Sequence, residues 1–596
     1  MRLLLILVTF AAALLQAQQP YPPTAENSAP AWFVDVAGKA GITVRNVNGA
    51  ATGKRYILES TGSGVAILDY DRDGWPDIFV VNGSDLSHVT ESVANAKKMA
   101  RKKTKSVTDA AGGPPTNHLF HNNHDGTFTD VTVKAGLVST GWGQGVCAGD
   151  YDNDGFDDLY VTGYGHNRLF HNEGDGTFKE VSAPAGVAGS GAEWGTGCAF
   201  IDYDRDGKLD LAVANYVHFD LSKVPLPGGA AGCLWKGTPV MCGPRGLPSA
   251  PNLLFHNLGG GRFEDVSERS GFQKTAAHYC FSITTLDYND DGWPDLYVAC
   301  DSTPAILYRN NHDGTFTDTG ADAGVAFNED GREQAGMGST AGDYDGDGRL
   351  DLFKTNFSDD TATLYRNNGD GSFSDTTFAA GVGIHTEALG WGAMFADVDN
   401  DGWPDLLVAN GHVYPEVDTA RLGSNFREPR FLYHNLGNGH FADISNGAGP
   451  GLIEPYASRG LAVGDLWNDG RLEAVINNLG DRPLLLVNVA RNDNHWLGVR
   501  LIGTTSNRDG IGAKVTLHSA KRVWVDEVRS GSSYNSSNDL RIHFGLGKET
   551  VFTGLEVRWP SGTIEAFEVP ASMDRQIALK EGAGWSGKET DRSNRR

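Results

Sequence analysis

The chain has little positive charge for its length. Its 596 residues include 50 Lys and Arg against 75 Asp and Glu, which gives a formal net charge of −25. Because nucleic-acid phosphates require a cationic footprint, we expect no nucleic-acid partner. Long apolar runs are also scarce. After the N-terminus no stretch reaches the roughly 20 residues that a membrane-spanning helix needs, so we expect no transmembrane segment.

Sequence signatures of enzymes are missing. The chain has no GxSxG nucleophile elbow, no GxxxxGK[ST] phosphate loop, no HExxH and no GxGxxG between a strand and a helix. These absences favour a binding protein over an enzyme. A carbohydrate-active or biosynthetic enzyme stays open as the alternative, because the acidic pair of a glycosidase needs no local motif.

Cysteine is sparse, with six residues and no CxxC pair, so a zinc ribbon is not expected. Cys233 and Cys242 lie in a Gly- and Pro-rich segment with little core to hold it, and we predict a disulfide between them. The other four cysteines lie in or beside strand-like segments. They are compatible with buried thiols or with bridges, and their pairing is left open: Cys147, Cys198, Cys280 and Cys300.

The N-terminus reads MRLLLILVTFAAALLQAQQP. One positive residue, an apolar run from Leu3 to Leu15 and then small residues are typical of a secretory signal peptide, which we place at residues 1–17. A membrane anchor is the alternative, but the apolar run is short for a span. We therefore expect a secreted protein, periplasmic or extracellular.

An acidic string recurs along the chain. DYDRDGWPD at 69–77 returns in similar form at 150–158, 202–210, 287–295, 343–351 and 397–405, and DLWNDGRLE at 465–473 is a degenerate seventh copy. Each copy precedes an apolar run and a segment ending in Asn such as HLFHN, and most copies are then followed by a Gly/Asp turn and a segment such as FTDV. Four short strands in each of seven units predict an all-β fold, a seven-bladed β-propeller over residues 31–490.

The first repeat-like segment, FVDVAGKAGI from Phe33, matches the fourth strand of a unit. The last unit, near 460–488, has three strands and lacks a fourth. We therefore predict that residues 33–36 complete the last blade, which removes an exposed sheet edge.

The acidic strings are called loops 1 to 7 in chain order, and loops 1 to 6 follow the pattern D-x-[DN]-x-D-G-x-x-D. Oxygen ligands at places 1, 3 and 5 with Gly at place 6 resemble the start of an EF-hand loop, and an all-oxygen cage suits Ca²⁺. A plain Asp/Gly turn is the alternative. We predict about six Ca²⁺ sites in loops 1 to 6, with ligands from the side chains at places 1, 3, 5 and 9 and the carbonyl at place 7. The predicted metal ligands are Asp69, Asp71, Asp73, Trp75, Asp77, Asp150, Asp152, Asp154, Phe156, Asp158, Asp202, Asp204, Asp206, Lys208, Asp210, Asp287, Asn289, Asp291, Trp293, Asp295, Asp343, Asp345, Asp347, Arg349, Asp351, Asp397, Asp399, Asp401, Trp403 and Asp405.

Loop 7 has Trp467 at place 3 and Glu473 at place 9, so we expect weak or no binding there. A histidine recurs in the third strand of several units, and we expect a structural role for it rather than metal ligation. These histidines are His121, His171, His256 and His434.

The repeats resemble the FG-GAP/VCBS family of calcium-loop propeller repeats, which also occur in integrin α chains. From Asn494, NHWLGVRLIGTTSNRDGIGAKVTL, VRSGSSYNSSNDLRIHFGLG and LEVRWPSG look like the ASPIC/UnbV domain of the cartilage acidic protein family. The resemblance implies a secreted calcium-binding propeller followed by a small β domain.

The residues themselves predict a small sandwich-like β domain at 491–570, made of alternating strands, and a polar tail at 571–596 without order. Arg529, Ser532 and Arg558 are candidates to contact a polar ligand. Turn and rim positions of the sandwich are the other interpretation of these three residues.

In a propeller blade the strand 1–2 and strand 3–4 loops share one face, and the strand 2–3 loops share the other. The surplus residues at 84–116, 216–251 and 411–430 fall between strands 2 and 3, so they predict a binding face opposite the calcium loops. The basic run KKMARKKTK at 97–105 is either a helix that contacts an acidic glycan or lipid surface, or a solvated helical face. We expect an extracellular binding or adhesion module whose ligand is a glycan or a protein.

Overall fold

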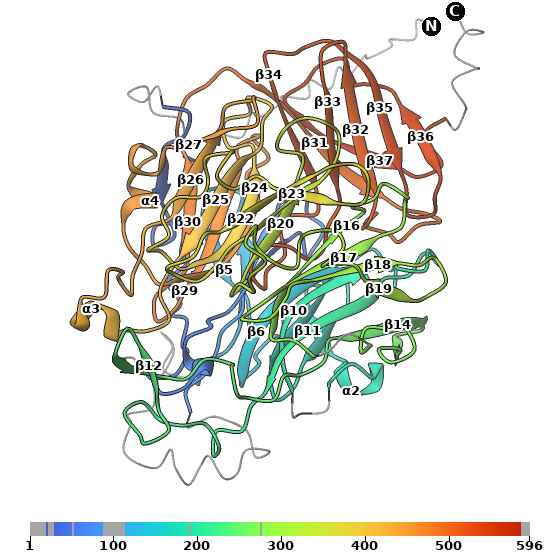
Figure 1. Cartoon of the computed structure of the whole chain (residues 1–596). Coiled ribbons are helices and arrows are strands. Elements are labelled where there is room, and N and C mark those ends of the chain that lie inside the picture. Colours follow the sequence, from blue (N-terminus) through green and yellow to red (C-terminus); the bar gives the residue numbers. More distant parts are fainter. Residues whose placement is uncertain are drawn as a thin grey trace, which may run out of the picture.

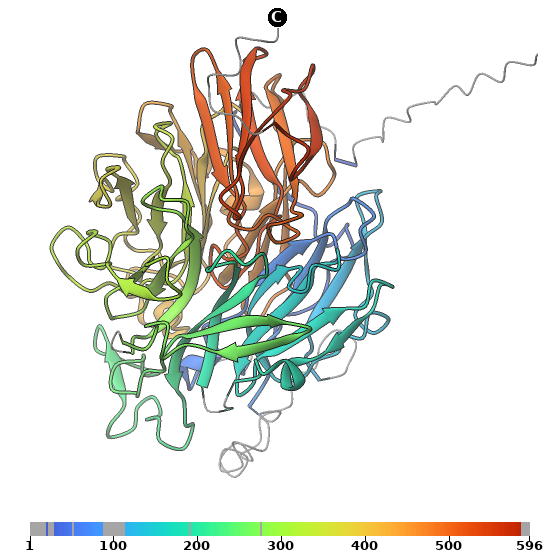
Figure 2. The same cartoon turned by 90° about the vertical axis from the view of Figure 1, so that its right-hand side faces the viewer.

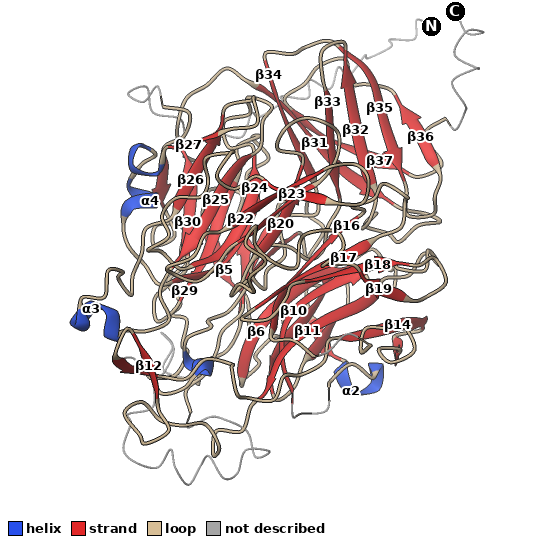
Figure 3. Ribbon diagram, in the orientation of Figure 1, coloured by secondary structure: helices blue, strands red, loops and turns tan. Residues whose placement is uncertain are grey.

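The computed structural model describes residues 20–21, 29–50, 53–86, 114–189, 191, 193–274 and 277–585. The expected signal peptide and the basic run at 97–105 lie outside these residues. The described part is all-β apart from a few short helical segments (Figure 3). Those segments are η1 (Ile57–Glu59), α2 (Ser182–Ala185), α3 (Glu416–Ala420), η3 (Ser445–Gly447) and α4 (Pro450–Ile453). No helix in the described ranges is long and apolar enough to cross a membrane.

Antiparallel four-stranded units repeat along the chain, as predicted (Figure 1). The first three units consist of β2 (Val65–Leu68), β3 (Asp77–Val80), β4 (His118–Asn122) and β5 (Phe128–Asp130); β6 (Trp142–Gly149), β7 (Asp158–Tyr164), β8 (Arg168–Asn172) and β9 (Phe178–Glu180); and β10 (Glu193–Ile201), β11 (Asp210–His218), β14 (Leu253–Gly259) and β15 (Arg262–Asp265).

The next three units follow the same order without an inserted strand. They consist of β16 (Cys280–Leu286), β17 (Asp295–Cys300), β18 (Ile306–Asn310) and β19 (Phe316–Asp318); β20 (Ser339–Gly342), β21 (Asp351–Lys354), β22 (Thr363–Asn367) and β23 (Phe373–Asp375); and β24 (Gly390–Ala396), β25 (Asp405–Asn410), β26 (Phe431–Asn435) and β27 (Phe441–Asp443).

The last sheet joins the two ends of the repeat region. It consists of β28 (Ser458–Gly464), β29 (Glu473–Asn478), β30 (Leu484–Asn488) and β1 (Phe33–Asp35). Strand β1 pairs with β30 in the register Phe33 to Asn488 and Asp35 to Leu486. The predicted closure of the last blade by the N-terminal strand is therefore confirmed.

The first strands of the units are neighbours in a closed circle, in the order β2, β6, β10, β16, β20, β24, β28 and back to β2. The second and third units are also joined into one eight-stranded sheet by a pairing between Trp194 and Tyr164. We interpret that sheet as two repeat units, and the closed circle of first strands agrees with a β-propeller.

Burial along a blade follows the strand order. Second strands such as β17 are buried at every residue, because sheets pack on both of their faces. Fourth strands such as β19 bury only their first residue, Phe316, and expose the next two. The continuous apolar runs of the second strands and the polar residues of the fourth strands follow from these positions.

A buried asparagine lies at or near the end of the third strand of each unit and links it to the preceding unit. Its side-chain amide donates to the backbone carbonyl at place 2 of the preceding acidic loop, as Asn172 does to Tyr70 at 2.8 Å. The bond from Asn122 to the Leu466 carbonyl, at 2.9 Å, connects the first unit to the last. The corresponding bonds in the other units join Asn257 to Tyr151, Asn310 to Tyr203, Asn367 to Tyr288, Asn435 to Tyr344 and Asn488 to Val398.

The C-terminal domain is a pair of sheets that share an apolar core around Leu497, Val515 and Trp559. It lies on one side of the repeat units in both views (Figures 1 and 2, red). One sheet has β34 (Ile542–Gly547), β31 (His495–Ile502) and β37 (Arg575–Lys580); the other has β33 (Val523–Glu527), β32 (Lys514–Ser519), β35 (Phe552–Arg558) and β36 (Ile564–Phe567).

The prediction of a disordered tail at residues 571–596 is wrong for residues 575–580. Strand β37 pairs in parallel with β31, with Leu497 opposite Arg575 and Ile502 opposite Lys580. The backbone N–H groups of that strand are used in a sheet, so residues 575–580 belong to the folded domain. The described chain continues to residue 585.

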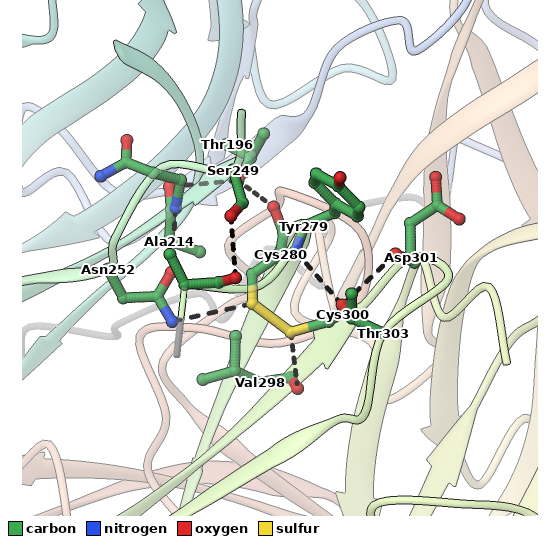
Figure 4. Close-up of a disulfide and its surroundings, with 12 residues drawn as sticks. Thr196, Ala214, Ser249, Asn252, Tyr279, Cys280, Val298, Cys300, Asp301 and Thr303 are labelled. Carbon is green, nitrogen blue, oxygen red and sulfur yellow. Dashed lines mark hydrogen bonds between the residues drawn. A yellow bond between two sulfur atoms is a disulfide. The ribbon is translucent and has the colours of Figure 1, made fainter. Parts of the chain in front are cut away.

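Three disulfides are present, and no cysteine is free. The predicted Cys233–Cys242 bridge is confirmed; it closes the hairpin of β12 (Cys233–Trp235) and β13 (Thr238–Val240). Cys280–Cys300 joins directly opposed residues of β16 and β17 (Figure 4). Cys147–Cys198 joins β6 to β10 of the next unit. The four cysteines whose state the sequence left open therefore form disulfides.

The centre of the ring is filled by the C-terminal domain's own chain. The loop of residues 530–538, called the central loop, lies between β33 and β34 and contacts the first strand of every unit. Ser537 bridges to Ala66 on β2, and Ser533 bridges to Ser339 on β20. Further contacts come from Val146 N to the Asn535 carbonyl, Phe200 N to Ser530 Oγ, Phe281 and Trp391 to the Tyr534 ring, and Val463 N to Asn538 Oδ1.

Tyr534 is the fully buried centre of this loop. Its hydroxyl donates to the Thr61 carbonyl at 3.0 Å and accepts from the Gln144 amide at 3.2 Å. The approach is close enough to require glycine on the facing strands: a Cβ on Gly64 would lie 1.7 Å from the Asn535 carbonyl oxygen. The small residues of the first strands therefore make room for the central loop.

Candidate calcium loops and their surroundings

Each acidic loop turns on its own carboxylate at place 1. In loop 2, Asp150 accepts the N–H of Asp154 at 3.0 Å and of Gly155 at 2.7 Å. The turn needs positive φ at Asn153 (62°) and at Gly155 (101°), which explains the Gly at place 6. Loops 1, 3, 4, 5 and 6 make the corresponding bond from Gly at place 6 to Asp at place 1.

The carboxylate at place 9 begins the second strand and is buried. Asp158 accepts the N–H of Asn172 at 2.7 Å through Oδ1 and the N–H of Tyr151 at 3.2 Å through Oδ2. The place-9 residue therefore joins the loop to the third strand of its own blade. A metal ion would share these oxygens with the backbone.

The carboxylates converge closely enough to hold a cation. One oxygen from each of Asp69, Asp71 and Asp73 lies within 4.8 Å of the others. Several buried carboxylate oxygens in the loops have no hydrogen-bond partner, namely Asp69 Oδ1, Asp71 Oδ1, Asp202 Oδ1, Asp295 Oδ2 and Asp345 Oδ1. Buried, unpartnered acceptors are costly, and a hard divalent cation would satisfy them. The residues present thus fit Ca²⁺.

The burial and crowding of the loop carboxylates raise their pKa values. Burial, followed by the neighbouring carboxylates, raises the pKa of Asp202 to about 8. Burial, with the carboxylate of Asp509 as the next cause, raises the pKa of Asp150 to about 8. Burial also raises the pKa of Asp69 to about 6. A bound divalent cation would act in the opposite direction and favour the ionised form.

The recurring histidines point at the loops. His171 Nδ1 lies 3.1 Å from Asp158 Oδ1 and 3.5 Å from Asp152 Oδ2, at places 9 and 3. His121, His256 and His434 contact the same places of their own loops. The expected structural role agrees with these hydrogen bonds, and the same geometry leaves a ring nitrogen beside the candidate metal position.

Basic side chains distinguish some loops from others. In loop 5, Arg366 pairs with both Asp345 and Asp347, and Arg349 pairs with Asp347. In loop 3, Lys208 pairs with Asp206. These cations already neutralise part of the acidic cluster, so a metal ion in loops 3 and 5 must displace or share their partners.

Loop 7 differs further. Arg471 binds Asp469 at 2.5 Å, and Arg541 from the C-terminal domain donates to the Asp465 carbonyl at 2.7 Å. Trp467 occupies place 3, where loops 1, 2, 3, 5 and 6 have Asp, and its Nε1 has no hydrogen-bond partner. The expectation of weak or no binding in loop 7 fits this arrangement.

Sequence reasoning missed that the C-terminal domain covers the acidic loops. Asp509 accepts the N–H of Asp150 at 2.7 Å, and Glu527 accepts the N–H of Asp287 at 3.1 Å. The Arg522 guanidinium lies 3.5 Å over the Trp403 ring of loop 6. The residues of the C-terminal domain contact loops of different blades that are remote in the chain. No local sequence pattern could therefore predict these contacts.

The three ligand-contact candidates of the C-terminal domain have other partners. Arg558 binds Asp287 of loop 4 at 2.5 Å, and Ser532 is buried in the central loop. Arg529 pairs with Asp526 at 2.5 Å and has one unpartnered N–H group. None of the three is an exposed rim residue, so the interpretation as sandwich rim positions is wrong, and contact with a polar ligand stays a prediction.

On the face opposite the acidic loops, the second insertion (216–251) packs against residues of the fifth unit and of the third insertion. Trp235 of the β12–β13 hairpin contacts Phe357, His412 and Tyr414 through ring contacts of 4.9–6.4 Å. Lys236 pairs with Asp359 at 2.8 Å and bonds the Leu422 carbonyl in the third insertion. The hairpin and α3 lie away from the C-terminal domain (Figures 1 and 2). Most of the first insertion, 84–116, lies outside the described residues.

Comparisons with known proteins agree with this architecture. The FG-GAP-like repeat family matches residues 107–161, 150–213, 287–354 and 343–408, and the ASPIC and UnbV family matches residues 503–585. The chain therefore contains FG-GAP-like repeats followed by an ASPIC and UnbV domain.

Curated relatives are named cartilage acidic protein 1. The mouse protein is 26% identical over 401 residues, covering 65% of this chain and 54% of its own length. The human protein is 26% identical over 383 residues, covering 62% of this chain and 50% of its own length. The chain thus spans about half the length of the curated relatives it matches.

Solved structures with a similar arrangement include a lectin from Agrocybe aegerita that recognises non-reducing terminal N-acetylglucosamine. It has a TM-score of 0.37 and 16% identity and covers 70% of this chain and 86% of its own. A lectin from Burkholderia pseudomallei has a TM-score of 0.41 and 10% identity. The match covers 73% of this chain and 98% of the lectin chain. At these scores neither structure bears on the function of this chain.

Proposed function

We propose that the protein is a secreted, calcium-binding β-propeller that binds an extracellular glycan or protein on the face of its insertions. The observation that carries the proposal is the position of the C-terminal domain. It covers the acidic loops and fills the centre of the ring, so the insertions provide the remaining loop-rich face. The three disulfides support an oxidising compartment.

In this proposal the calcium ions are structural. The side chains at places 1, 3, 5 and 9 of loops 1 to 6 and the carbonyls at place 7 hold about six ions, and loop 7 holds none. The ions neutralise the acidic loops on which the C-terminal domain rests. We propose residues 31–490 as the propeller and 491–585 as the ASPIC and UnbV domain, with a signal peptide at 1–17.

The binding face is tested with two exposed apolar residues. Leu234 lies on the β12–β13 hairpin and Val551 on the C-terminal domain, and each is 67% exposed. The mature protein is applied to a glycan array and to an extracellular-matrix extract, with calcium and with chelator. We expect Leu234→Arg to abolish the capture seen with wild type and Val551→Arg to leave it unchanged, with equal melting temperatures. Loss with Val551→Arg alone would place the ligand on the other face.

A further inference from the structure

One position in the third strand of each unit divides the acidic loops into classes. The residue directly before the buried asparagine is His in the units of loops 1, 2, 3 and 6, Arg in those of loops 4 and 5, and Val in that of loop 7. These residues are His121, His171, His256, Arg309, Arg366, His434 and Val487. Loops with nearly the same aspartates therefore have different neighbours, and four of them form a histidine class.

In the histidine class the same ring nitrogen lies beside the same two carboxylates. The Nδ1 atom lies 3.1 Å from the place-9 oxygen in loops 2 and 3 and 2.9 Å from it in loop 6. It lies 3.5 Å from the place-3 oxygen in loop 2 and 3.4 Å from it in loop 3, and both separations are 3.4 Å in loop 1. In each of the four loops one oxygen of place 3, one of place 9 and a ring nitrogen lie within 4.8 Å of one another.

These separations resemble the edges of a metal coordination polyhedron. With bonds of about 2.1 Å, neighbouring ligands of a tetrahedral or octahedral ion lie about 3.0–3.4 Å apart. The observed separations of 2.9–3.5 Å are close to that range. One ion can therefore contact the imidazole and both carboxylates after only small movements of these side chains.

Loop 3 also contains a buried oxygen that an ion would satisfy. Asp202 at place 1 is 1% exposed, and its Oδ1 has no hydrogen-bond partner. A metal ion bonds oxygen at about 2.1 Å, closer than the roughly 2.8 Å of a hydrogen-bonded water, so it can reach an atom that a water cannot. Because an unpaired buried acceptor is costly, this oxygen favours an ion in the loop that His256 borders.

Packing holds the imidazole rings in position. In loops 1, 2 and 3 the tyrosine at place 2 packs edge-on against the histidine, with ring centres 6.0–6.1 Å apart and interplanar angles of 72–88°. These tyrosines are Tyr70, Tyr151 and Tyr203. A ligand atom that is already oriented loses less conformational entropy when the ion binds.

We propose that loops 1, 2, 3 and 6 bind a first-row transition-metal ion such as Zn²⁺ or Mn²⁺, with the histidine Nδ1 as a direct ligand beside the carboxylates at places 3 and 9. A mixed set of imidazole nitrogen and carboxylate oxygen suits these ions, whereas Ca²⁺ takes oxygen ligands. In loop 5 the arginine class supplies a resident cation instead, because Arg366 pairs with Asp345 at place 3. The inference rests on the proposed metal role of the acidic loops and replaces the structural role expected for these histidines.

Other histidines that contact carboxylates have a different geometry. The described contacts of His124 and His312 with the acidic loops are to the place-5 carboxylates of loops 1 and 4, at 2.7 and 2.9 Å. His495 lies 2.9 Å from Asp574 in the C-terminal domain, away from the acidic loops. An imidazole beside a single carboxylate offers too few ligands for a metal site, so His495 provides a control.

The test measures Co²⁺ and Ca²⁺ binding to the mature protein after chelation, by equilibrium dialysis and metal analysis. Co²⁺ serves as the transition-metal probe because it accepts both imidazole and carboxylate ligands. His171→Gln and His256→Gln each remove one proposed nitrogen ligand, so that the result does not depend on the folding of a single variant. His495→Gln is the matched control, because it removes an imidazole that also contacts a carboxylate. The melting temperature in calcium shows that each variant is folded.

We expect four tight Co²⁺ sites in the wild type and in His495→Gln, and three in His171→Gln and in His256→Gln. The remaining site of each loop variant should bind Co²⁺ about a hundredfold more weakly, while its Ca²⁺ affinity is unchanged. Equal Co²⁺ binding by the wild type and both loop variants would overturn the proposal. So would a parallel loss of Co²⁺ and Ca²⁺ affinity, because the imidazole would then only orient a carboxylate. Four histidine-dependent Co²⁺ sites in a protein that binds no Ca²⁺ would support this inference and contradict the calcium sites of the proposed function.

Discussion

At the scale of single residues, the same aspartate pattern serves two purposes. Asp150 shapes its turn by accepting two backbone N–H groups, and in the proposed function the unpartnered oxygens of Asp69, Asp71 and Asp202 bind a cation. The sequence pattern alone could not separate these contributions. The distinction matters because a turn needs only the backbone bonds, whereas a metal site needs the remaining oxygens.

Substituting one loop residue should remove one ion. We expect Asp202→Ala to lower the calcium stoichiometry by one and to lower the melting temperature in calcium but barely in EDTA. Glu473→Ala in loop 7 should change neither the stoichiometry nor the calcium-dependent part of stability, although it loses the buried bond from Leu466 N to Glu473. Metal analysis and thermal unfolding measure both quantities. An unchanged stoichiometry in Asp202→Ala would contradict the assignment of loop 3.

At the scale of elements, the central loop connects the C-terminal domain to every blade. Its serines and Tyr534 hydrogen-bond the first strands, so the propeller closes around a segment from another domain. The run VRSGSSYNSSND has no apolar periodicity that would predict burial. Small polar residues satisfy strand backbone groups that point into a narrow channel, which explains this composition.

Truncating the centre of this loop should be severe. Tyr534→Ala should cost about 3–5 kcal/mol of unfolding free energy, the range for a buried aromatic residue replaced by alanine. Tyr534→Phe keeps the ring contacts with Phe281 and Trp391 and should cost about 1–3 kcal/mol through the bonds lost to Thr61 and Gln144. Chemical denaturation in calcium measures both. A cost below 1 kcal/mol for Tyr534→Ala would contradict a packed channel.

At the scale of the whole molecule, the propeller and the C-terminal domain form one interlocked unit. The ring is closed by β1 and by the Asn122 bond to Leu466, and the second domain is anchored in its centre. The acidic loops lie at the joint. Calcium binding should therefore support both domains together.

Chelation should lower the stability of the entire chain in a single transition. Ca²⁺ binds the native loops and hardly the unfolded chain, so each site should contribute about 2.7 kcal/mol at a hundredfold excess over Kd. Calorimetry with and without EDTA provides the measurement. A melting temperature indifferent to EDTA, in protein shown to be free of calcium, would mean that the aspartates are ordinary turn residues. Two separate transitions would contradict the interlocked arrangement.

The sequence by itself determined the features that repeat or lie close together. Period and strand pattern predicted the all-β repeats, the lone fourth-strand motif at Phe33 predicted the closure, and proximity in a loop-rich segment predicted Cys233–Cys242. In loop 1 local spacing also predicted the convergence of the oxygens at places 1, 3 and 5, because a tight turn brings these places together.

Only the tertiary structure decided what occupies the space between these elements. It placed the central loop in the ring, Asp509 and Arg522 on the acidic loops, and β37 beside β31, where the sequence predicted a polar tail. It also paired Cys147 with Cys198 and Cys280 with Cys300. These contacts join residues remote in the chain. Their energy depends on shape and on satisfied buried polar groups, which no local pattern encodes.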